Sequence, residues 1–269
     1  GNELRVPVKG TFGNALVAIC DAADKVLWSY HIWVSESEDI PYKNDVAGEY
    51  KMMDRNLGAL STKLKDQNSY GCFYQWGRKD PFPRPVPVTR PTAADKYKNP
   101  DVELTPNTAA TEETGTIGYT LSHPDTRLLD ASSWYKAGMP EGLWGNPEGN
   151  ENGGKGVKTI YDPCPEGYRV ADPMCYSMDW KKDKAFCDAN YGYDFVTDSG
   201  SSKSTFATSG YLSTTSNAME YLEYRGAVWT NAPVGGKGLR FYFNNASVKN
   251  NDGMPFTNGL PVRCVKETK

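Results

Sequence analysis

Two neighbouring stretches near the start of the chain are rich in apolar residues: residues 15–20 are apolar throughout, and residues 26–34 include polar positions. In the second stretch Trp28 and every second residue after it are apolar, so these side chains would share one face of a β-strand. The polar residues 21–25 separate the two stretches, and the whole pattern predicts a β-hairpin. His31 lies between aromatic residues on the opposite face, where we expect a hydrogen-bonded structural histidine rather than a ligand.

Two segments carry the start and stop signals of short helices. The first covers residues 70–82; it follows polar residues and meets Gly77 and then a proline. The second covers residues 174–189, with Asp172 as the N-cap and Pro173 at the first helical position. The sequence therefore predicts one helix early in the chain and one in its second half.

Short strands and irregular loops account for most of the remaining chain. A strand running into a turn is predicted at residues 51–58 and a turn entering a strand at 161–170, with further strands at 210–212, 227–230, 239–243 and 261–266. A stretch rich in Pro, Thr and Ala at 83–116 predicts an irregular insertion. The loop at 145–156 holds two Glu and three Asn, but their spacing matches no calcium-binding loop, so we expect a solvated surface loop. These patterns predict an α+β fold with two short helices, small antiparallel sheets and long irregular loops.

The composition argues against several classes of function. Lys and Arg number 30 against 33 Asp and Glu, a net charge of -3, and no basic block is present, so nucleic acid is not an expected partner. With two histidines in the chain, a histidine-based metal or acid–base site is not expected, and no cofactor is predicted. No apolar stretch reaches the roughly 20 residues that cross a bilayer, so no transmembrane segment is predicted. We interpret Gly1 as the start of a mature fragment whose targeting segment has been removed.

Six cysteines are scattered along the chain without a CxxC motif, which argues against zinc ribbons and thioredoxin-like chemistry. Their number fits an oxidising compartment. Cys175 and Cys187 flank the second predicted helix, and on a straight helix they would lie about 18 Å apart, too far for a disulfide. Any disulfide is therefore expected to join more distant parts of the chain.

Six motifs, taken in order, resemble a known family. They are residues 54–58 (DRNLG), 70–81 (YGCFYQWGRKDP), 143–145 (LWG), 161–170 (YDPCPEGYRV), 229–230 (WT) and 262–265 (VRCV). Over residues 45–267 the chain resembles the Fibrobacter major paralogous domain and its relatives in Bacteroides surface lipoproteins and fimbria-associated proteins. The resemblance implies a C-type-lectin-like fold, related to that of formylglycine-generating enzymes. It also implies an extracellular protein of the cell surface, lipid-anchored in the outer membrane before trimming.

The resemblance further implies a disulfide between Cys164 and Cys264. Closing a loop of about 100 residues would stabilise the fold by ~4–5 kcal/mol in the chain-entropy model. No pairing is predicted for the other four cysteines, Cys20, Cys72, Cys175 and Cys187. Residues 46–269 would form the lectin-like domain, and residues 1–45 would be a hairpin segment that either belongs to it or is the remnant of a preceding β domain.

We expect a non-catalytic binding or adhesion domain whose partner is a glycan or a surface protein. Sugar rings stack on aromatic faces, and sugar hydroxyls bond to amide and guanidinium groups. The candidate ligand-binding residues are Trp134, Trp144, Tyr224, Arg225 and Asn231. Of these, the two tryptophans and Tyr224 are expected to be exposed, whereas Trp76 and Trp229 are expected in the core. Tyr135, Tyr211 and Arg240 lie in the same loop-rich regions.

Calcium-dependent C-type lectins carry Glu-Pro-Asn or Gln-Pro-Asp together with Trp-Asn-Asp. This chain has Trp229-Thr230-Asn231 in the second place and lacks the first tripeptide, so any glycan is expected to bind without calcium. One alternative is a fimbrial tip or accessory subunit that acts in assembly or protein adhesion, with fimbrial subunits as partners. Another is an enzyme of the formylglycine-generating type. That chemistry uses two closely spaced cysteines near the C-terminus, where this chain has only Cys264, so catalysis is not expected.

Overall fold

The computed structural model describes most of the chain as small sheets joined by loops. The described residues are 4–82, 106–140, 142–146, 156–177, 184–196, 203–214 and 218–267. Within them lie two short α-helices and several small sheets, all antiparallel but one, which confirms the α+β class and the small antiparallel sheets expected from the sequence. The predicted insertion at 83–116 and the predicted loop at 145–156 fall largely outside the described residues.

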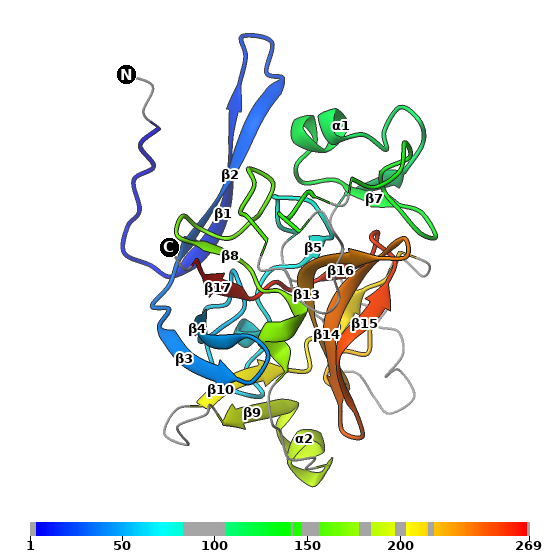
Figure 1. The fold of residues 1–269 in the computed structure, drawn as a ribbon. Helices are drawn as coiled ribbons and strands as arrows, with labels where there is room; N and C mark the ends of the chain where they lie inside the picture. Colours follow the sequence, from blue (N-terminus) through cyan, green and yellow to red (C-terminus); the bar gives the residue numbers. More distant parts are fainter. Residues whose placement is uncertain are drawn as a thin grey trace.

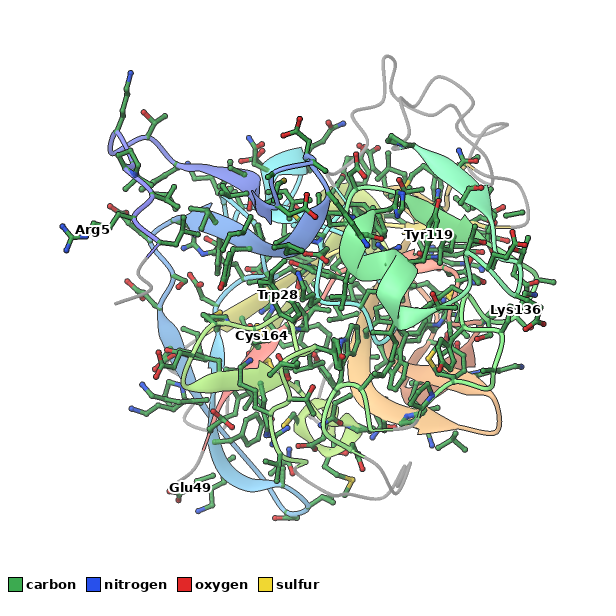
Figure 2. All side chains as sticks on the ribbon, turned by 90° about the horizontal axis from the view of Figure 1, so that it is seen from above. Arg5, Trp28, Glu49, Tyr119, Lys136 and Cys164 are labelled. Carbon is green, nitrogen blue, oxygen red and sulfur yellow. A yellow bond between two sulfur atoms is a disulfide. The ribbon has the colours of Figure 1, made fainter. Side chains whose placement is uncertain are left out.

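The N-terminal hairpin predicted from the alternating pattern is confirmed. Strands β1 (Gly13–Cys20) and β2 (Val26–Val34) pair antiparallel. The turn between them extends beyond the rest of the described chain (Figure 1). Helix α1 (Ile117–Ser122) lies beside β2, as the view from above also shows (Figure 2).

Two polar residues, Ser29 and His31, lie on the face of β2 that is turned toward the rest of the molecule. The Ser29 hydroxyl donates a hydrogen bond to Asp80 at 2.6 Å. The His31 ring is hydrogen-bonded to the Asn14 side chain at 2.8 Å and to the Tyr74 hydroxyl at 3.0 Å. His31 is therefore the hydrogen-bonded structural histidine expected from the sequence. Burial lowers the pKa of its ring to about 4, which favours the neutral form.

A four-stranded sheet joins distant parts of the chain, in the order β3 (Asp39–Asn44), β4 (Gly48–Met53), β17 (Cys264–Lys266) and β8 (Tyr168–Val170). The last strand of the chain thus lies between an early strand and a middle one, and Cys264 is paired with Val170. Residue 45, the proposed domain boundary, falls in the turn between the paired strands β3 and β4. The division into residues 1–45 and 46–269 stays a prediction.

The other sheets surround this one. A second four-stranded sheet has the order β12 (Met219–Glu220), β11 (Tyr211–Leu212), β16 (Gly259–Leu260) and β5 (Tyr74–Gln75). A three-stranded sheet consists of β13 (Arg225–Val234), β14 (Lys237–Asn244) and β15 (Val248–Met254). Two further pairs are antiparallel β9 (Gly192–Val196) with β10 (Lys203–Ala207), and parallel β6 (Asn107–Ala109) with β7 (Arg127–Leu129). The predicted strands around residues 211, 228 and 241 are thereby confirmed.

The helix predicted over residues 70–82 is wrong. Gly71 and Gly77 have φ values of 79° and 85°, outside the helical region. Between these two glycines the backbone forms β5, and the backbone N–H of Trp76 donates to the Phe256 carbonyl at 3.2 Å. Residues 69–78 are all buried, so the apolar residues here do not mark one face of a helix. Only a 3₁₀ turn, Gln67–Ser69, precedes this segment.

The second predicted helix is correct at its start and wrong in its length. Asp172 is the N-cap and accepts from the Met174 and Cys175 N–H groups, as predicted, but the segment is a 3₁₀ turn, Pro173–Tyr176. Ser177 has a ψ of 60°, which ends the turn. Helix α2 (Lys184–Asn190) follows, and residues 178–183 lie outside the described chain. Helix α1, whose N-cap Thr116 accepts from the Tyr119 N–H, is not among the predicted elements.

Two large apolar clusters lie on opposite faces of the sheet β13–β14–β15. We call the first the tryptophan cluster; it contains Trp76, Trp134, Trp144 and Trp229 together with Cys164 and Cys264. We call the second the phenylalanine cluster; it contains Phe195, Phe206, Phe241, Phe243 and Tyr176. Because successive strand residues point to opposite faces, β13 directs Trp229 into the first cluster and Val228 into the second.

Candidate functional site

Two of the residues expected to bind a ligand are buried in the core. Trp134 and Trp144 are only 1% and 0% exposed, so the expectation that they lie at the surface is wrong. The Trp134 indole donates to the Trp76 carbonyl at 2.8 Å, and the Trp144 ring lies 5.4 Å from the Trp76 ring. The bonded N–H lets the Trp134 indole be buried without losing a hydrogen bond, whereas the Trp144 indole N–H is buried with no hydrogen-bond partner among the described residues. The burial of Trp76 and Trp229 confirms the core position predicted for both.

The other three candidates divide between core and surface. Asn231 is buried in β13 and accepts a hydrogen bond from the Asn146 side chain at 3.3 Å, so it connects this strand to the loop that contains Asn146. Tyr224 is 37% exposed, and Arg225, the first residue of β13, is half-buried. The structure therefore leaves Tyr224 and Arg225 at the surface and separates them from the two tryptophans.

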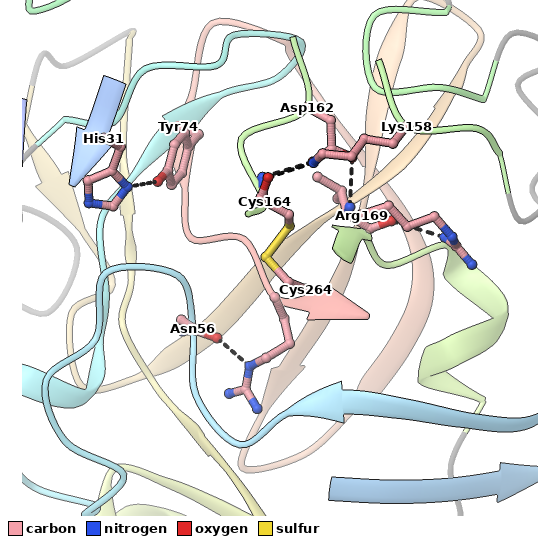
Figure 3. Close-up of a disulfide and its surroundings, with 10 residues drawn as sticks. His31, Asn56, Tyr74, Lys158, Asp162, Cys164, Arg169 and Cys264 are labelled. Atoms are coloured by element: carbon pink, nitrogen blue, oxygen red, sulfur yellow. Dashed lines mark hydrogen bonds and ion pairs between the residues drawn. A yellow bond between two sulfur atoms is a disulfide. The ribbon is translucent and has the colours of Figure 1, made fainter. Parts of the chain in front are cut away.

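The disulfide implied by the family resemblance is present. Cys164 and Cys264 are bonded across a separation of 100 residues, inside the tryptophan cluster (Figure 3). Asp162, beside the bond, accepts from the Cys164 N–H at 2.8 Å, the Val170 N–H at 2.9 Å and Lys158 Nζ at 3.0 Å. Burial raises the pKa of Asp162 even though Lys158 acts in the opposite direction. This carboxylate therefore holds the loop that leads from the disulfide into β8.

The other four cysteines form no disulfide in the described chain: Cys20 is exposed, whereas Cys72, Cys175 and Cys187 are buried. Burial raises the pKa of the Cys187 thiol to about 11, and that of Cys175 further still. Thiols of this kind are poor nucleophiles at neutral pH.

Tyrosines and arginines gather where β11, β12, β13 and β14 meet. We call this group the tyrosine–arginine patch: Tyr211, Tyr221, Arg225, Arg240 and Tyr242. Arg240 and Tyr242 alternate with Leu239, Phe241 and Phe243 along β14, so they occupy the face opposite the phenylalanine cluster. Tyr211 comes from β11, and Tyr221 follows β12 in the turn that leads to Arg225.

The rings and guanidinium groups of the patch form a closed circle of contacts. Arg225 Cζ lies 3.4 Å from the centre of the Tyr221 ring and 5.9 Å from that of Tyr242. Arg240 Cζ lies 4.9 Å from the centre of the Tyr242 ring and 5.9 Å from that of Tyr211. The rings of Tyr211 and Tyr221 lie 5.7 Å apart and complete the circle. Each guanidinium is thus held between aromatic rings, an arrangement worth about 0.5–2 kcal/mol per contact.

The two arginines of the patch differ in their charge partners. Arg240 donates through Nε and Nη2 to the Asp252 carboxylate, at 2.8 and 2.6 Å. Tyr211 donates to Glu220 at 2.7 Å, and burial together with this hydrogen bond raises the pKa of its hydroxyl. Among the described residues, no carboxylate lies within ion-pair distance of Arg225. The guanidinium N–H groups of Arg225 therefore donate to no acidic side chain of the described residues.

A strained turn carries this unpaired arginine. Tyr221 and Glu223 have φ values of 55° and 66°, which residues other than glycine seldom adopt. The Tyr224 and Arg225 N–H groups both donate to the Tyr221 carbonyl at 3.0 Å, and the Gly210 N–H donates to the Arg225 carbonyl at 2.8 Å. Backbone strain of this kind persists only where surrounding contacts enforce it, and it is found at functional sites more often than elsewhere.

The sequence predicts this site only in part. Tyr224 and Arg225 are among the predicted ligand-binding residues, and Tyr211 and Arg240 lie in the same loop-rich regions, but Tyr221 and Tyr242 are not predicted. The alternation along β14 was a usable signal for Tyr242, because its neighbours Phe241 and Phe243 point to the other face. No local signal marks Tyr221, since its contact with Arg225 depends on the left-handed turn.

In the described part of the chain no group of three or more His, Cys, Asp or Glu residues is placed to hold a metal ion. No helix of the described chain combines the length and the apolar character that a membrane span requires. No family model, curated protein or solved structure matches the chain.

Proposed function

We propose that the chain is a non-catalytic binding domain that recognises glycan without calcium through the tyrosine–arginine patch. The observation that carries this proposal is the circle of three tyrosine rings and two guanidinium groups on one face of the sheet β13–β14–β15. Flat rings can stack on the C–H face of a sugar, and fixed guanidinium donors can orient its hydroxyls. The exposed Tyr224 would add a ring next to Arg225 in the sequence.

The domain would have a C-type-lectin-like fold and belong with the Fibrobacter major paralogous domain and the related Bacteroides surface proteins. Two observations support this assignment. The disulfide joins the two cysteines that the resemblance pairs. The last strand, β17, lies between β4 and β8, so both ends of the resembling region meet in one sheet.

The proposed location is the cell surface, with a lipid anchor in the outer membrane before trimming. Disulfides persist in oxidising compartments, and the bond between Cys164 and Cys264 is consistent with such a place. Binding without calcium is supported by the sequence Trp229-Thr230-Asn231, because Thr230 supplies no carboxylate where the calcium-dependent lectins have Asp.

A non-catalytic role is supported by the state of the cysteines. An enzyme of the formylglycine-generating type needs a reactive thiol, but Cys264 is bonded to Cys164. The thiols of Cys175 and Cys187 are buried and have raised pKa values. We therefore place the enzyme alternative behind the binding function.

The N-terminal hairpin favours a second candidate function, adhesion to a protein or assembly with fimbrial subunits. Ile19 and Tyr30 lie on the outer face of β1–β2 and are 38% and 43% exposed, and Leu27 near the turn is 54% exposed. Apolar side chains grouped at an exposed strand pair are typical of contacts between proteins.

The two functions can be separated with one set of variants. The purified chain is screened on a broad glycan array with calcium and with EDTA, together with Tyr224→Ala and, as a matched aromatic control on the hairpin, Tyr30→Ala. We expect calcium-independent binding that Tyr224→Ala weakens and Tyr30→Ala preserves. If the array shows no binding at all, the glycan proposal is wrong. A complex with purified fimbrial subunits that only Tyr30→Ala disrupts would then establish the second function.

A further inference from the structure

We propose that the glycan bound at the tyrosine–arginine patch is acidic, and that Arg225 binds the carboxylate of a uronic-acid residue. This inference rests on the proposed function and adds the chemical class of the ligand. It is carried by the position of Arg225, which is stacked on a ring, half-buried and without an acidic partner among the described residues.

Stacking orients the Arg225 guanidinium and leaves its donors available. With Cζ 3.4 Å from the centre of the Tyr221 ring, the ring covers one face of the group. The N–H bonds lie in the plane of the guanidinium, so covering a face does not block them. The ring also restricts the side chain before any ligand arrives, which lowers the entropy lost on binding.

The charges around Arg225 favour an anion there. Asp252 is bound by both Nε and Nη2 of Arg240, and Glu220 accepts the Tyr211 hydroxyl. These two carboxylates therefore have donors of their own. Lys249, 3.5 Å from Asp252, adds a further cation on the same side of the sheet. Glu223 lies two residues before Arg225 in the same turn, but no ion pair between them is found, so Arg225 is the arginine of the patch that has no acidic partner among the described residues.

A carboxylate fits this group better than other anions do. Two parallel N–H donors of a guanidinium match the two oxygens of a carboxylate in one plane. The adjacent rings of Tyr211 and Tyr221, 5.7 Å apart, supply apolar surface for the sugar that carries the carboxylate. A uronic-acid residue combines both features in one unit.

The test uses an array of uronic-acid oligosaccharides, their methyl esters, sulfated oligosaccharides of equal charge and neutral oligosaccharides. The unesterified uronic acids are expected to bind most tightly, and affinity should fall as salt rises from 0.1 to 1 M, since the screening length shrinks from about 10 to about 3 Å. Arg225→Gln is expected to raise the Kd by about 10- to 100-fold, the loss expected for a charged hydrogen-bonded contact. Arg225→Lys keeps the charge but loses the planar pair of donors, so it should also weaken binding, by about tenfold.

The matched control is Lys43→Gln, which removes an exposed cation from β3, on a different sheet. It should leave the Kd unchanged, and urea unfolding should show that both Arg225 variants are folded. Equal binding of acids and methyl esters, or equally tight binding of sulfated sugars, would overturn the carboxylate assignment while glycan binding stands. If no saccharide binds, both the proposed glycan-binding function and this inference are wrong.

Discussion

The tryptophan cluster and the tyrosine–arginine patch lie on the same face of the sheet β13–β14–β15, yet one is buried and the other is partly exposed. Trp229 on β13 is paired directly with Arg240 on β14, so the border between the two regions runs through one cross-strand pair. The indoles of Trp76 and Trp229 donate to the backbone carbonyls of Thr230 and Tyr74, at 2.9 and 2.7 Å.

The contrast shows that burial of these flat groups depends on how many donors they carry and how many of those donors find partners, although Trp144 is buried with its one N–H unbonded among the described residues. An indole has one donor, which a single carbonyl satisfies. A guanidinium has five donors, and within the described part of the chain Arg225 contacts rings but forms no ion pair with an acidic side chain. Burying such a group without partners would cost more than its ring contacts return, which fits the half-buried state of Arg225, whereas Tyr242 beside it is buried.

The first way to break the comparison is to remove the disulfide from the tryptophan cluster. The double variant Cys164→Ser/Cys264→Ser should lose about 4–5 kcal/mol of unfolding free energy, because the bond closes a loop of about 100 residues. Urea unfolding of the oxidised chain and the variant measures this loss. A loss below about 1 kcal/mol would mean that the sheet β4–β17–β8 holds the last strand without the bond.

The second way to break the comparison is to truncate one tryptophan. Trp134→Ala should cost about 3–5 kcal/mol, because it removes a fully buried ring and the hydrogen bond to the Trp76 carbonyl. If Trp134 contacted a ligand at the surface instead, the variant would lose binding with little loss of stability. Urea unfolding together with binding at a temperature where the variant is folded distinguishes the two cases.

The third uses pH to weaken one edge of the tryptophan cluster without changing the patch. His31 bonds to Tyr74, a member of that cluster, and its pKa falls from 6.5 to about 4 on folding. The unfolded chain therefore binds the proton more readily. The stability that the neutral ring contributes is complete above about pH 6.5 and is lost as the pH falls toward 4, with a slope of up to ~1.4 kcal/mol per pH unit.

The measurement for this third prediction is the urea midpoint between pH 7.5 and 4 for the native chain and for His31→Gln. The variant should be less stable at pH 7.5 and should show a flatter pH dependence. Asp130, whose pKa is lowered to about 2 chiefly through its bond to Lys136, acts only below about pH 4, so the two effects fall in separate ranges. Identical pH profiles for both proteins would rule out His31 as the titrating group.

The sequence predicted the fold better than it predicted the site. The hairpin β1–β2, the N-cap at Asp172 and the strands of the C-terminal half follow local patterns that short segments carry by themselves. The helix expected over residues 70–82 failed because this segment is buried on all sides and pairs with residues far away in the chain. Local propensity cannot report such pairing.

The prediction of the candidate site failed for a related reason. Trp134 and Tyr224 both lie in loop-rich sequence, and nothing in their neighbourhoods shows that one indole reaches a distant carbonyl while the other ring reaches solvent. Tyr221 joins the patch only because its φ of 55° turns the chain, and a positive φ at a tyrosine has no sequence signal.

The last prediction has the smallest effect on stability and separates the two regions most clearly. Tyr224 is 37% exposed, so Tyr224→Ala removes little buried surface, and the unfolding free energy should change by no more than about 0.5 kcal/mol. Glycan binding should nevertheless fall by about tenfold, since a stacked aromatic contact is worth about 1 kcal/mol or more. Calorimetric titration with a glycan that the native chain binds, alongside urea unfolding, measures both quantities.

Tyr30→Ala provides the matched control for Tyr224→Ala, because Tyr30 is a tyrosine of similar exposure on the hairpin. Equal losses of binding in the two variants would mean that the ligand surface extends beyond the patch. A loss of several kcal/mol of stability in Tyr224→Ala would place Tyr224 with the buried tryptophans and leave Arg225 to bind its ligand without that ring. The paired measurement therefore decides whether the open half of the sheet face is a binding surface or only the unburied margin of the core.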